Sequence, residues 1–600
     1  MINPPDKQKT YVLKNAYLFE RDEDKYQVFM DLSVMYDIAK NSSADNSLSY
    51  DALYAGNNII NFITQGSHSK ESYQEAIELG KKFFTADSGG SSRDCLHAIG
   101  NCHIDCAWLW PYGETVRKVA RSWSSTLSMI NDGLDFKFAG SQVVQFDWLK
   151  THYPSLFSAL QKQVKDLRFI PVGGSWVEMD TNIPSGESMI RQFLYGQKFY
   201  QKEFGKHSDI LWLPDTFGYS GQLPQIMKLC DVSYFLSQKL SWNLTNTFPH
   251  HSFYWKGIDQ SKVLAYFPPG DTYESHVNTK DILKTIVNNK DKGRTHDQML
   301  LFGYGDGGGG PTPDMIERLN RFSAVQGFPE IILSTPDEFF KALEKSSSML
   351  CEWWGELYFE LHRGTYTSHA KLKEYNRRFE FMMIDIEFLS MTYGTQLRSL
   401  DIFEQLWKII LFNQFHDIIP GSSIEEVFKD AMADYAKFLE LYNVQWNNVL
   451  NIMENSINVV VNPYNWPRRQ IVELENTEKV MINVPGLYVG QVFKDVTSDR
   501  TNVVETADFI YLNNNTISAK FSINGSLHSL VHKQSDRESL SEGVRGNRFV
   551  VFDDIPLFWD AWDVMEYHTE VRHEYMPTGL TVSALIINIS IFIHFLMLMS

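Results

Sequence analysis

Between Cys95 and about residue 350, short apolar segments alternate with amphipathic stretches of helical period, and this alternation constrains the fold more than any other feature. It predicts an α/β domain built on a mainly parallel sheet, because parallel strands need crossover helices between them. The predicted strands are 96–99, 136–139, 169–172, 210–213 and 299–302. Each is followed by a polar or glycine-rich turn, and in such folds the chemistry lies at the carboxyl ends of the strands.

The rest of the chain divides into regions of different period. Residues 26–39 and 71–84 are predicted helices, and the small polar segment 87–93 indicates a domain boundary. Three runs of helical spacing between about residues 360 and 455 predict a three-helix bundle. After residues 462–467, short apolar runs bounded by turns predict strands as far as about residue 563. The predicted regions are an N-terminal mixed region 1–94, a catalytic domain 95–355, a helical domain 356–455, a β domain 456–578 and an apolar tail 579–600.

Composition excludes some classes of function. The net charge of −18 argues against nucleic acid or an anionic membrane surface as the main partner. Five cysteines in 600 residues are too few for a disulfide framework and indicate a reducing compartment, which favours a cytoplasmic protein. The N-terminus has no apolar run of the kind found in a secretory signal.

Two predicted strands are followed by side chains that suit a metal. His103 and Asp105 stand two residues apart in an extended segment, so both point the same way, and imidazole with carboxylate suits Zn²⁺. A simple hydrogen bond between them is the alternative. Asp215 directly follows the strand 210–213, where the alternative is a helix N-cap.

Two further residues complete the candidate set. Asp306 follows the strand 299–302 and precedes four consecutive glycines, which allow a bulky ligand to approach the backbone closely; a flexible turn is the alternative. No Lys-Ser/Thr pair follows, so a Walker-type phosphate loop is excluded. His416 ends an apolar helix, where a histidine can also serve as a dipole partner. Asp417 could orient its ring.

Taken together, these residues predict a metal-assisted hydrolase. Two histidines and two carboxylates make a four-coordinate site, and one further carboxylate is left free as a proton donor. Trp108, which follows the His103–Asp105 pair, suits stacking on the apolar face of a sugar ring, although a core tryptophan is the alternative.

The ordered series of motifs resembles glycoside hydrolase family 38, the zinc-dependent retaining α-mannosidases, and is most similar to its cytosolic type. The motifs are His103-Ile104-Asp105, Gly173-Gly174-Ser175-Trp176-Val177-Glu178, Leu213-Pro214-Asp215-Thr216-Phe217-Gly218-Tyr219-Ser220, Gly303-Tyr304-Gly305-Asp306-Gly307-Gly308-Gly309-Gly310, Glu356-Leu357-Tyr358-Phe359-Glu360-Leu361-His362-Arg363-Gly364-Thr365-Tyr366-Thr367 and Asn413-Gln414-Phe415-His416-Asp417. They span roughly residues 95–460, and the family-like text continues to about residue 576.

The resemblance implies a fold and a set of roles. The expected fold is a seven-stranded (β/α) barrel followed by a three-helix middle domain and a partial β-sandwich. The resemblance implies Zn²⁺, with Co²⁺ able to substitute, held by His103, Asp105, Asp215 and His416. Asp215 would also be the nucleophile and Asp306 the acid/base. Trp108 would stack on the sugar bound beside the metal, and Lys239 would lie near the nucleophile. The substrates would be mannose-containing oligosaccharides with terminal α-linkages.

Other interpretations remain open from the sequence. The chain is shorter than the family at both ends, so an inactive or sugar-binding fragment is the alternative function; a zinc-dependent deacetylase on a similar barrel is a third. The tail 579–600 is predicted to lie outside the folded hydrolase, with a membrane anchor as the alternative because its length could span a bilayer. Linkage preference, the physiological metal and homo-oligomer formation are not encoded in any motif.

Overall fold

The computed structural model describes residues 12–42, 47–84, 94–393, 400–453, 459–473, 479–491 and 501–575. The predicted boundary segment 87–93 and the tail 579–600 lie outside these residues. The chain divides into two compact units. Unit 1 is Met1–Phe381, Leu400–Leu441 and Ala561–Asp563, and unit 2 is Met382–Ser399, Tyr442–Asp560 and Val564–Ser600.

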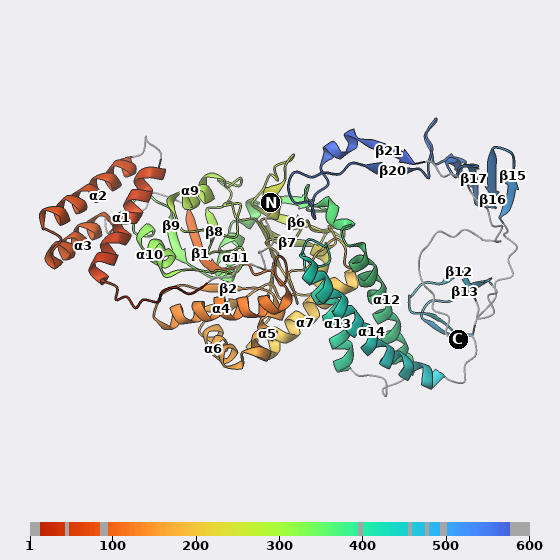
Figure 1. The fold of residues 1–600 in the computed structure, drawn as a ribbon, viewed down its shortest axis with the longest axis horizontal. Helices are drawn as coiled ribbons and strands as arrows, with labels where there is room; N and C mark the ends of the chain where they lie inside the picture. The colour runs from red at the N-terminus through yellow and green to blue at the C-terminus, as the bar shows by residue number, and fades with distance from the viewer. Residues whose placement is uncertain are drawn as a thin grey trace. The chain divides into compact units, whose positions relative to one another are not determined.

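Three helices precede the predicted α/β region. They are α1 (Glu23–Asn41), α2 (Ser47–Gln65) and α3 (Lys70–Phe84), so the two predicted helices are confirmed and α2 is additional. Gly56 of α2 faces α1, where an added Cβ would lie at ordinary contact distance, 3.8 Å from a methyl of Leu32. Two ion pairs attach α1 to α10 (Pro313–Phe322), Asp31 with Arg321 at 2.6 Å and Asp37 with Arg318 at 2.5 Å (Figure 1).

The α/β region contains two sheets, one with all of its pairings parallel and one mixed. One has the order β3-β2-β1-β8, with β9 also paired to β1, and the other has the order β10-β6-β7-β5-β4. Among these pairings, only β6 with β7 is antiparallel. The bounds are β1 (Cys95–Asn101), β2 (Phe138–Gly140), β3 (Phe169–Pro171), β4 (Ile210–Trp212), β5 (Tyr234–Leu236), β6 (Ser252–Lys256), β7 (Lys262–Tyr266), β8 (Asp297–Phe302), β9 (Glu330–Leu333) and β10 (Cys351–Trp354).

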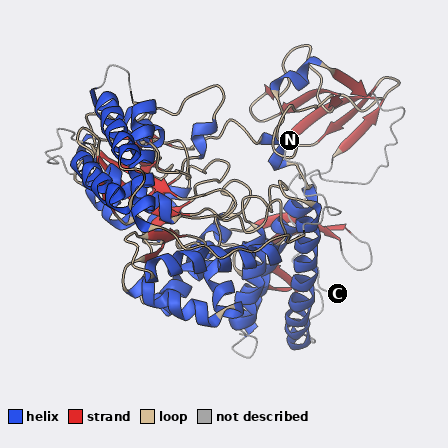
Figure 2. Cartoon of the chain, turned by 60° about the vertical axis from the view of Figure 1, so that its left-hand side comes forward, coloured by secondary structure: helices blue, strands red, loops and turns tan. Residues whose placement is uncertain are grey.

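The two sheets share one hydrophobic core, and this core fixes where the strand ends lie. Its buried side chains include Ile99 from β1, Trp212 from β4 and Leu301 from β8, together with Phe339 from a covering helix. The helices lie outside the strands in unit 1 (Figure 2). They are α4 (Tyr112–Asn131), α5 (Val143–His152), α6 (Pro154–Lys165), α7 (Gly186–Phe204), α8 (Leu223–Leu229), α9 (Thr279–Val287) and α11 (Pro336–Glu344), in addition to α10. The mainly parallel α/β organisation is therefore confirmed, and its closure into a barrel stays a prediction.

Three long helices follow, as the spacing predicts: α12 (Ala370–Tyr393), α13 (Leu400–Asn413) and α14 (Glu425–Met453). Within unit 1, the rings of Phe379 on α12 and Phe438 on α14 stack at 4.0 Å between centroids. Asn413, at the end of α13, donates to Asp434 on α14. The α7 side chain of Gln192 donates to the carbonyl of Leu411, which ties α13 to the α/β region. The end of α13 is thus held against the strand ends.

Unit 2 contains antiparallel strands after residue 459, which confirms the predicted change of period. A small core of Val460, Val472, Val480, Ile482 and Val484 lies under the first of them. The strands are β11 (Val459–Asn462), β12 (Arg468–Glu473), β13 (Lys479–Val484), β14 (Tyr488–Gln491), β15 (Asn502–Glu505), β16 (Phe509–Asn513), β17 (Ile517–Ser522), β18 (Leu527–His532), β19 (Arg537–Glu538), β20 (Phe549–Phe552) and β21 (Arg572–Tyr575). Strands β15 to β19 form one sheet in sequence order.

None of the helices in the described part of the chain is both long enough and apolar enough to cross a membrane. The tail 579–600, for which the sequence raised a membrane anchor as an alternative, lies outside that part. Both interpretations of the tail therefore stay predictions.

Candidate metal centre and active site

Four of the predicted site residues converge on one point. His103 and Asp105 follow β1, Asp215 follows β4, and His416 follows α13. One ligand atom from each lies within 4.8 Å of the others. His103, Asp105 and His416 are almost completely buried, whereas Asp215 is partly exposed. The cluster therefore has a closed side, made by the histidines, and an open side at Asp215.

The distances within this cluster are those of side chains that face a common centre. Asp105 Oδ1 lies 2.8 Å from His103 Nε2 and 3.3 Å from His416 Nε2. His416 Nε2 lies 4.0 Å from Asp215 Oδ2. Tetrahedral ligands at 2.0–2.2 Å from Zn²⁺ would lie about 3.3–3.6 Å apart. The observed separations fall on either side of that range, so small movements would give a zinc geometry.

Glu178 fixes the orientation of both histidines. Its Oε2 lies 3.0 Å from His103 Nδ1, and its backbone carbonyl accepts a hydrogen bond of 2.8 Å from His416 Nδ1. Ser141 donates to the other carboxylate oxygen, Oε1, at 2.5 Å. With both Nδ1 atoms engaged in this way, both Nε2 atoms are directed at the cluster. Such outer partners hold a metal-binding imidazole in the required tautomer.

The electrostatics of the cluster favour a cation. Burial by itself lowers the pKa of His103, but the carboxylates of Asp105 and Glu178 outweigh it and raise that pKa well above its usual value. For His416, burial again lowers the pKa and Asp105 raises it, with a net upward shift. His416 Nε2 is buried and has no hydrogen-bond partner. A buried nitrogen without a partner, facing two carboxylates, fits a metal ligand.

Lys239 lies beside Asp215, as the resemblance implies. Its ammonium group, at the start of a short 3₁₀ turn (Lys239–Trp242), is 2.6 Å from Asp215 Oδ1. The lysine is buried, and its charge also lies 4.3 Å from the ring of Trp242. One oxygen of Asp215 thus faces the cation and the other faces the histidines. The carboxylate is thus fixed between a cation and the candidate metal cluster.

Asp306 lies close enough to the cluster to respond to its charges. Although the residue is exposed, desolvation of the carboxyl group and the nearby carboxylates of Asp105, Asp215 and Glu274 raise its pKa to about 6. Its backbone N–H donates to Glu274 Oε2 at 3.3 Å. A carboxyl group with a pKa of about 6 is protonated to a larger extent near neutral pH than an ordinary aspartate, which suits it to donate a proton during catalysis.

The glycine run after Asp306 is required by packing against the metal-binding segment. Gly308 has φ +82°, and a Cβ there would lie 3.0 Å from Ile104, the residue between His103 and Asp105. Lys118 donates to the carbonyl of Gly307 at 3.3 Å. The close approach that the sequence assigned to a bulky ligand is thus made, at Gly308, by the protein itself.

Trp108 follows Asp105 by three residues and has part of its surface exposed. Its indole N–H is buried without a hydrogen-bond partner, and its ring contacts the edge of Trp110 at 5.7 Å. The backbone carbonyl of Trp108 accepts from the N–H of Ile424, which fixes the segment against the start of α14. The partly exposed ring leaves a face for a ligand, so the predicted stacking role remains open to test.

Two residues near the cluster carry a contact that the motifs did not predict. Asp563 Oδ1 accepts hydrogen bonds from the backbone N–H of His362 at 2.7 Å and from its Nδ1 at 2.8 Å. Both residues are buried, and the His362 ring packs edge-on against Phe217 at 4.8 Å, two residues after Asp215. Asp563 therefore supports the wall of the site from a distant part of the sequence, within unit 1.

Replacing Asp563 by alanine is expected to destabilise unit 1. Two buried donors of His362 would lose their acceptor, which costs about 1–3 kcal/mol in the free energy of unfolding. Urea denaturation followed by tryptophan fluorescence would measure the change in midpoint. The control is Asp560→Ala, at an exposed position nearby. Equal midpoints for the two variants would show that the contact contributes nothing.

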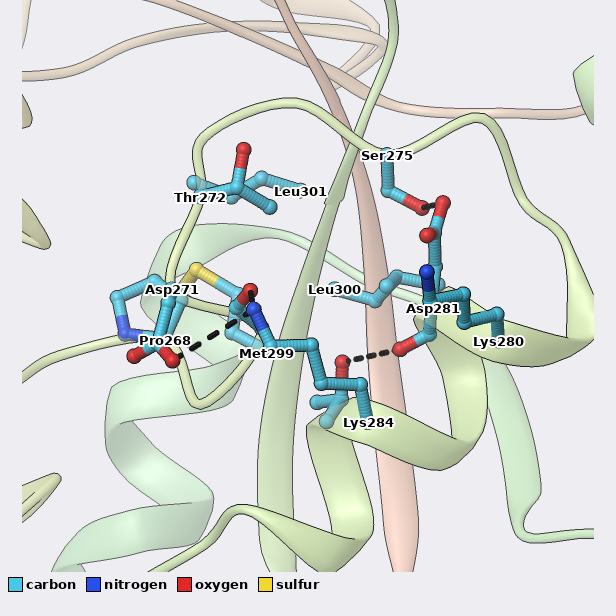
Figure 3. Close-up of a pocket in the computed structure, with 12 residues that line it drawn as sticks. Pro268, Asp271, Thr272, Ser275, Lys280, Asp281, Lys284, Met299, Leu300 and Leu301 are labelled. Atoms are coloured by element: carbon cyan, nitrogen blue, oxygen red, sulfur yellow. Dashed lines mark hydrogen bonds and ion pairs between the residues drawn. The ribbon is translucent and has the colours of Figure 1, made fainter. Parts of the chain in front are cut away.

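A pocket of about 250 Å³ lies elsewhere in unit 1, beside β8 and α9 (Figure 3). Three of its charged side chains, those of Asp271, Asp281 and Lys284, already pair with the protein. Lys284 lies 3.5 Å from Asp271 and donates to the carbonyl of Gly270, and Asp281 accepts from Ser275. We therefore place the chemistry at the four-residue cluster rather than in this pocket.

Three family models match successive parts of the sequence. "Glycosyl hydrolases family 38 N-terminal domain" matches residues 95–356, "Alpha mannosidase middle domain" matches residues 360–453, and "Glycosyl hydrolases family 38 C-terminal domain" matches residues 512–584. The first two include all four residues of the cluster, Asp306 and Lys239. The third ends at residue 584, so the similarity extends beyond residue 576, where the motifs alone suggested that it stops.

Curated relatives and one solved structure agree with these matches. Alpha-mannosidase 2C1 of Mus musculus is 43% identical over 95% of this chain, and Alpha-mannosidase G of Dictyostelium discoideum is 37% identical over 94%. The chain spans 57% and 58% of the length of these two relatives. An alpha-mannosidase from Enterococcus faecalis V583 superposes with a TM-score of 0.61 at 17% identity, over 74% of this chain and 61% of that one. The superposition supports a shared fold.

Proposed function

This chain belongs to glycosyl hydrolase family 38, and we propose that it is a zinc-dependent retaining α-mannosidase. Its substrates would be free or N-glycan-derived oligosaccharides with terminal α-mannosidic bonds, and it would act in the cytoplasm. The observation that carries the proposal is the convergence of His103, Asp105, Asp215 and His416 beside a carboxyl group with a raised pKa, that of Asp306.

In this proposal the four residues of the cluster hold one zinc ion. The ligands would be Nε2 of each histidine and one oxygen of each aspartate, a set that zinc accepts and Co²⁺ can also use. Bound zinc would act as a Lewis acid toward the hydroxyl groups of the sugar and so orient its ring. Trp108 would stack on the apolar face of the same ring.

Two carboxyl groups, Asp215 of the cluster and Asp306 outside it, divide the reaction into two steps. Asp215, whose Oδ1 lies 2.6 Å from the Lys239 ammonium group, would attack the anomeric carbon while the bond to the leaving oxygen breaks, and Asp306 would give its proton to that oxygen. Asp306 would then take a proton from a water molecule, which attacks the anomeric carbon and releases Asp215. Two inversions give net retention of configuration.

The domain organisation follows the same proposal. Residues 95–355 would close into the seven-stranded (β/α) barrel, 356–455 would form the three-helix middle domain, and 456–578 would contribute part of a β-sandwich. The shared core of the two sheets supports the first assignment. The contacts between α12, α13 and α14 support the second.

An assay of the purified chain on an aryl α-mannoside tests this function. We expect hydrolysis that a chelator abolishes and that added Zn²⁺ or Co²⁺ restores, while the matching β-mannoside stays intact. Metal bound without any hydrolysis would favour the alternative, an inactive or sugar-binding fragment. Hydrolysis that survives complete removal of metal would contradict the proposal.

The Glu178→Gln variant is expected to bind zinc about 10–100-fold more weakly. The side-chain nitrogen of the glutamine cannot accept from the Nδ1–H of His103, and its oxygen carries no charge, so the imidazole would be held less firmly than by the carboxylate. Competition with a chromogenic chelator measures the affinity. The control is Glu187→Gln, at a position in the first turn of α7 that pairs with Arg191. Equal zinc affinities in the two variants would mean that Glu178 does not orient the ligand.

A further inference from the structure

A second group of potential ligands lies at the opposite ends of the strands. Cys95 and His97 stand two residues apart on β1, and Asp297 is the register partner of Cys95 on the adjacent strand β8 (Figure 1). One ligand atom from each lies within 4.8 Å of the others. His97 is buried, and the other two are partly exposed, so an ion could enter from solvent.

The hydrogen bonds of His97 leave one ring nitrogen directed at a carboxylate. Nδ1 lies 2.9 Å from Ser334 Oγ, and that hydroxyl is in turn 3.3 Å from Glu338 Oε2. When the Ser334 hydroxyl donates to Glu338, the ring must donate through Nδ1. Nε2 then presents its lone pair to Asp297 Oδ1 at 3.0 Å. In the other tautomer Nε2 carries the proton and donates it to Asp297 Oδ1, and a bound zinc ion would take the place of that proton.

The separation of Nε2 and Oδ1 also resembles that within the catalytic cluster. There, Asp105 Oδ1 lies 2.8 Å from His103 Nε2 and 3.3 Å from His416 Nε2. The chain from His97 through Ser334 to Glu338 matches the way in which outer partners orient metal-binding imidazoles. The two groups therefore share ligand spacing and support for the histidine, although only the second group contains sulfur.

We propose that Cys95, His97 and Asp297 form a second zinc site, which joins the amino ends of β1 and β8. Thiolate, imidazole and carboxylate are all zinc ligands, and water would fill the fourth position. Without metal the thiol is held protonated, since burial and the carboxylates of Glu330 and Asp297 raise the pKa of Cys95 to about 12. Zinc displaces that proton, so binding strengthens with pH. The site stabilises the two strands from which His103 and the Asp306 loop follow.

Cobalt spectroscopy of the full chain tests the site without reference to activity. A thiolate bound to Co²⁺ gives an intense charge-transfer band in the near ultraviolet, and the catalytic cluster contains no sulfur ligand. We expect this band in the unmodified chain loaded with Co²⁺ and its loss in Cys95→Ser. The control is Cys230→Ser, at the end of α8, which should keep the band. A chain without the band, or a band that persists in Cys95→Ser, overturns the proposal.

Zinc stoichiometry provides the second measurement. Zinc-equilibrated chain should hold one more equivalent than Cys95→Ser when both are analysed by plasma mass spectrometry. Asp297→Asn removes a charge but keeps the shape of the side chain, and it should lower the affinity for the additional zinc ion at least tenfold. This variant provides the test if Cys95→Ser fails to fold. Equal zinc content in the unmodified chain and both variants overturns the proposal, whether or not the catalytic cluster is filled.

Discussion

The Asp215→Ala variant is expected to lose at least about 10⁴-fold in kcat/KM on α-mannosides, whatever the leaving group. The loss should be general because the nucleophile takes part in the first step for every substrate. Asp215 is placed for this role by its two neighbours, with Lys239 at 2.6 Å from one oxygen and His416 at 4.0 Å from the other. Initial rates on an aryl α-mannoside and on a mannose disaccharide measure the effect.

Because Asp215 is also a proposed metal ligand, the loss of nucleophile must be separated from the loss of zinc. Asp215→Asn keeps an oxygen that can bind metal but removes the nucleophile, so it should be as inactive as Asp215→Ala while it retains zinc at saturating concentration. Asp209→Ala, at the residue before β4, controls for disturbance of the strand and should keep activity. An active Asp215→Asn variant would remove Asp215 from the nucleophilic role.

The Asp306→Ala variant is expected to depend strongly on the leaving group. A disaccharide needs a proton on the departing oxygen, so its kcat/KM should fall by about 10²–10⁴-fold, whereas an aryl mannoside with an acidic phenol should lose far less. Asp166→Ala, at an exposed position after α6, is the control. Equal losses on both substrates would contradict the assignment of Asp306 as the acid.

The raised pKa of Asp306 predicts a pH dependence for the same reaction. The acid form is needed, and with a pKa of about 6 the group is protonated below that pH and loses its proton above it. For the disaccharide, kcat/KM should therefore decline as pH rises through about 6. An aspartate with the ordinary value would already be ionised there. The decline should be absent in Asp306→Asn; a decline that persists in that variant would belong to another group.

Much of the site could be predicted because parallel strands bring their carboxyl ends to one edge. His103 and Asp105 stand two residues apart after β1, and Asp215 directly follows β4, so their approach follows from the strand assignments alone. Lys239 was placed by resemblance and lies beside Asp215. The strands β5, β6, β7, β9 and β10 escaped prediction.

The partners that orient the histidines could not be predicted from period or spacing. Glu178 contacts His103 with its side chain and His416 with its backbone, and the second contact joins residues 238 apart in sequence. No local pattern encodes the direction of a backbone carbonyl in such a loop. The pairing of Asp563 with His362 escaped prediction for the same reason, since tertiary packing across 201 residues decides it.

Helix α2 was missed because its centre reads as a turn. Gly56-Asn57-Asn58 are poor helix formers and weaken the helical signal there. In the structure Gly56 is buried at the contact with α1, on the same face of α2 as Ala52 and Ile59. Burial of this face therefore outweighs the low helical propensity of the segment.

Trapping the glycosyl-enzyme tests the central claim most directly. A 5-fluoro-α-mannosyl fluoride forms the covalent intermediate quickly and releases it slowly, so intact-mass and peptide analysis can find where the sugar is bound. We predict one adduct per chain, on the carboxylate of Asp215, in the zinc-loaded protein and none after zinc is removed. An adduct on another residue, or turnover of α-mannosides with no adduct, would contradict the proposal that this cluster is the site of a zinc-dependent retaining α-mannosidase.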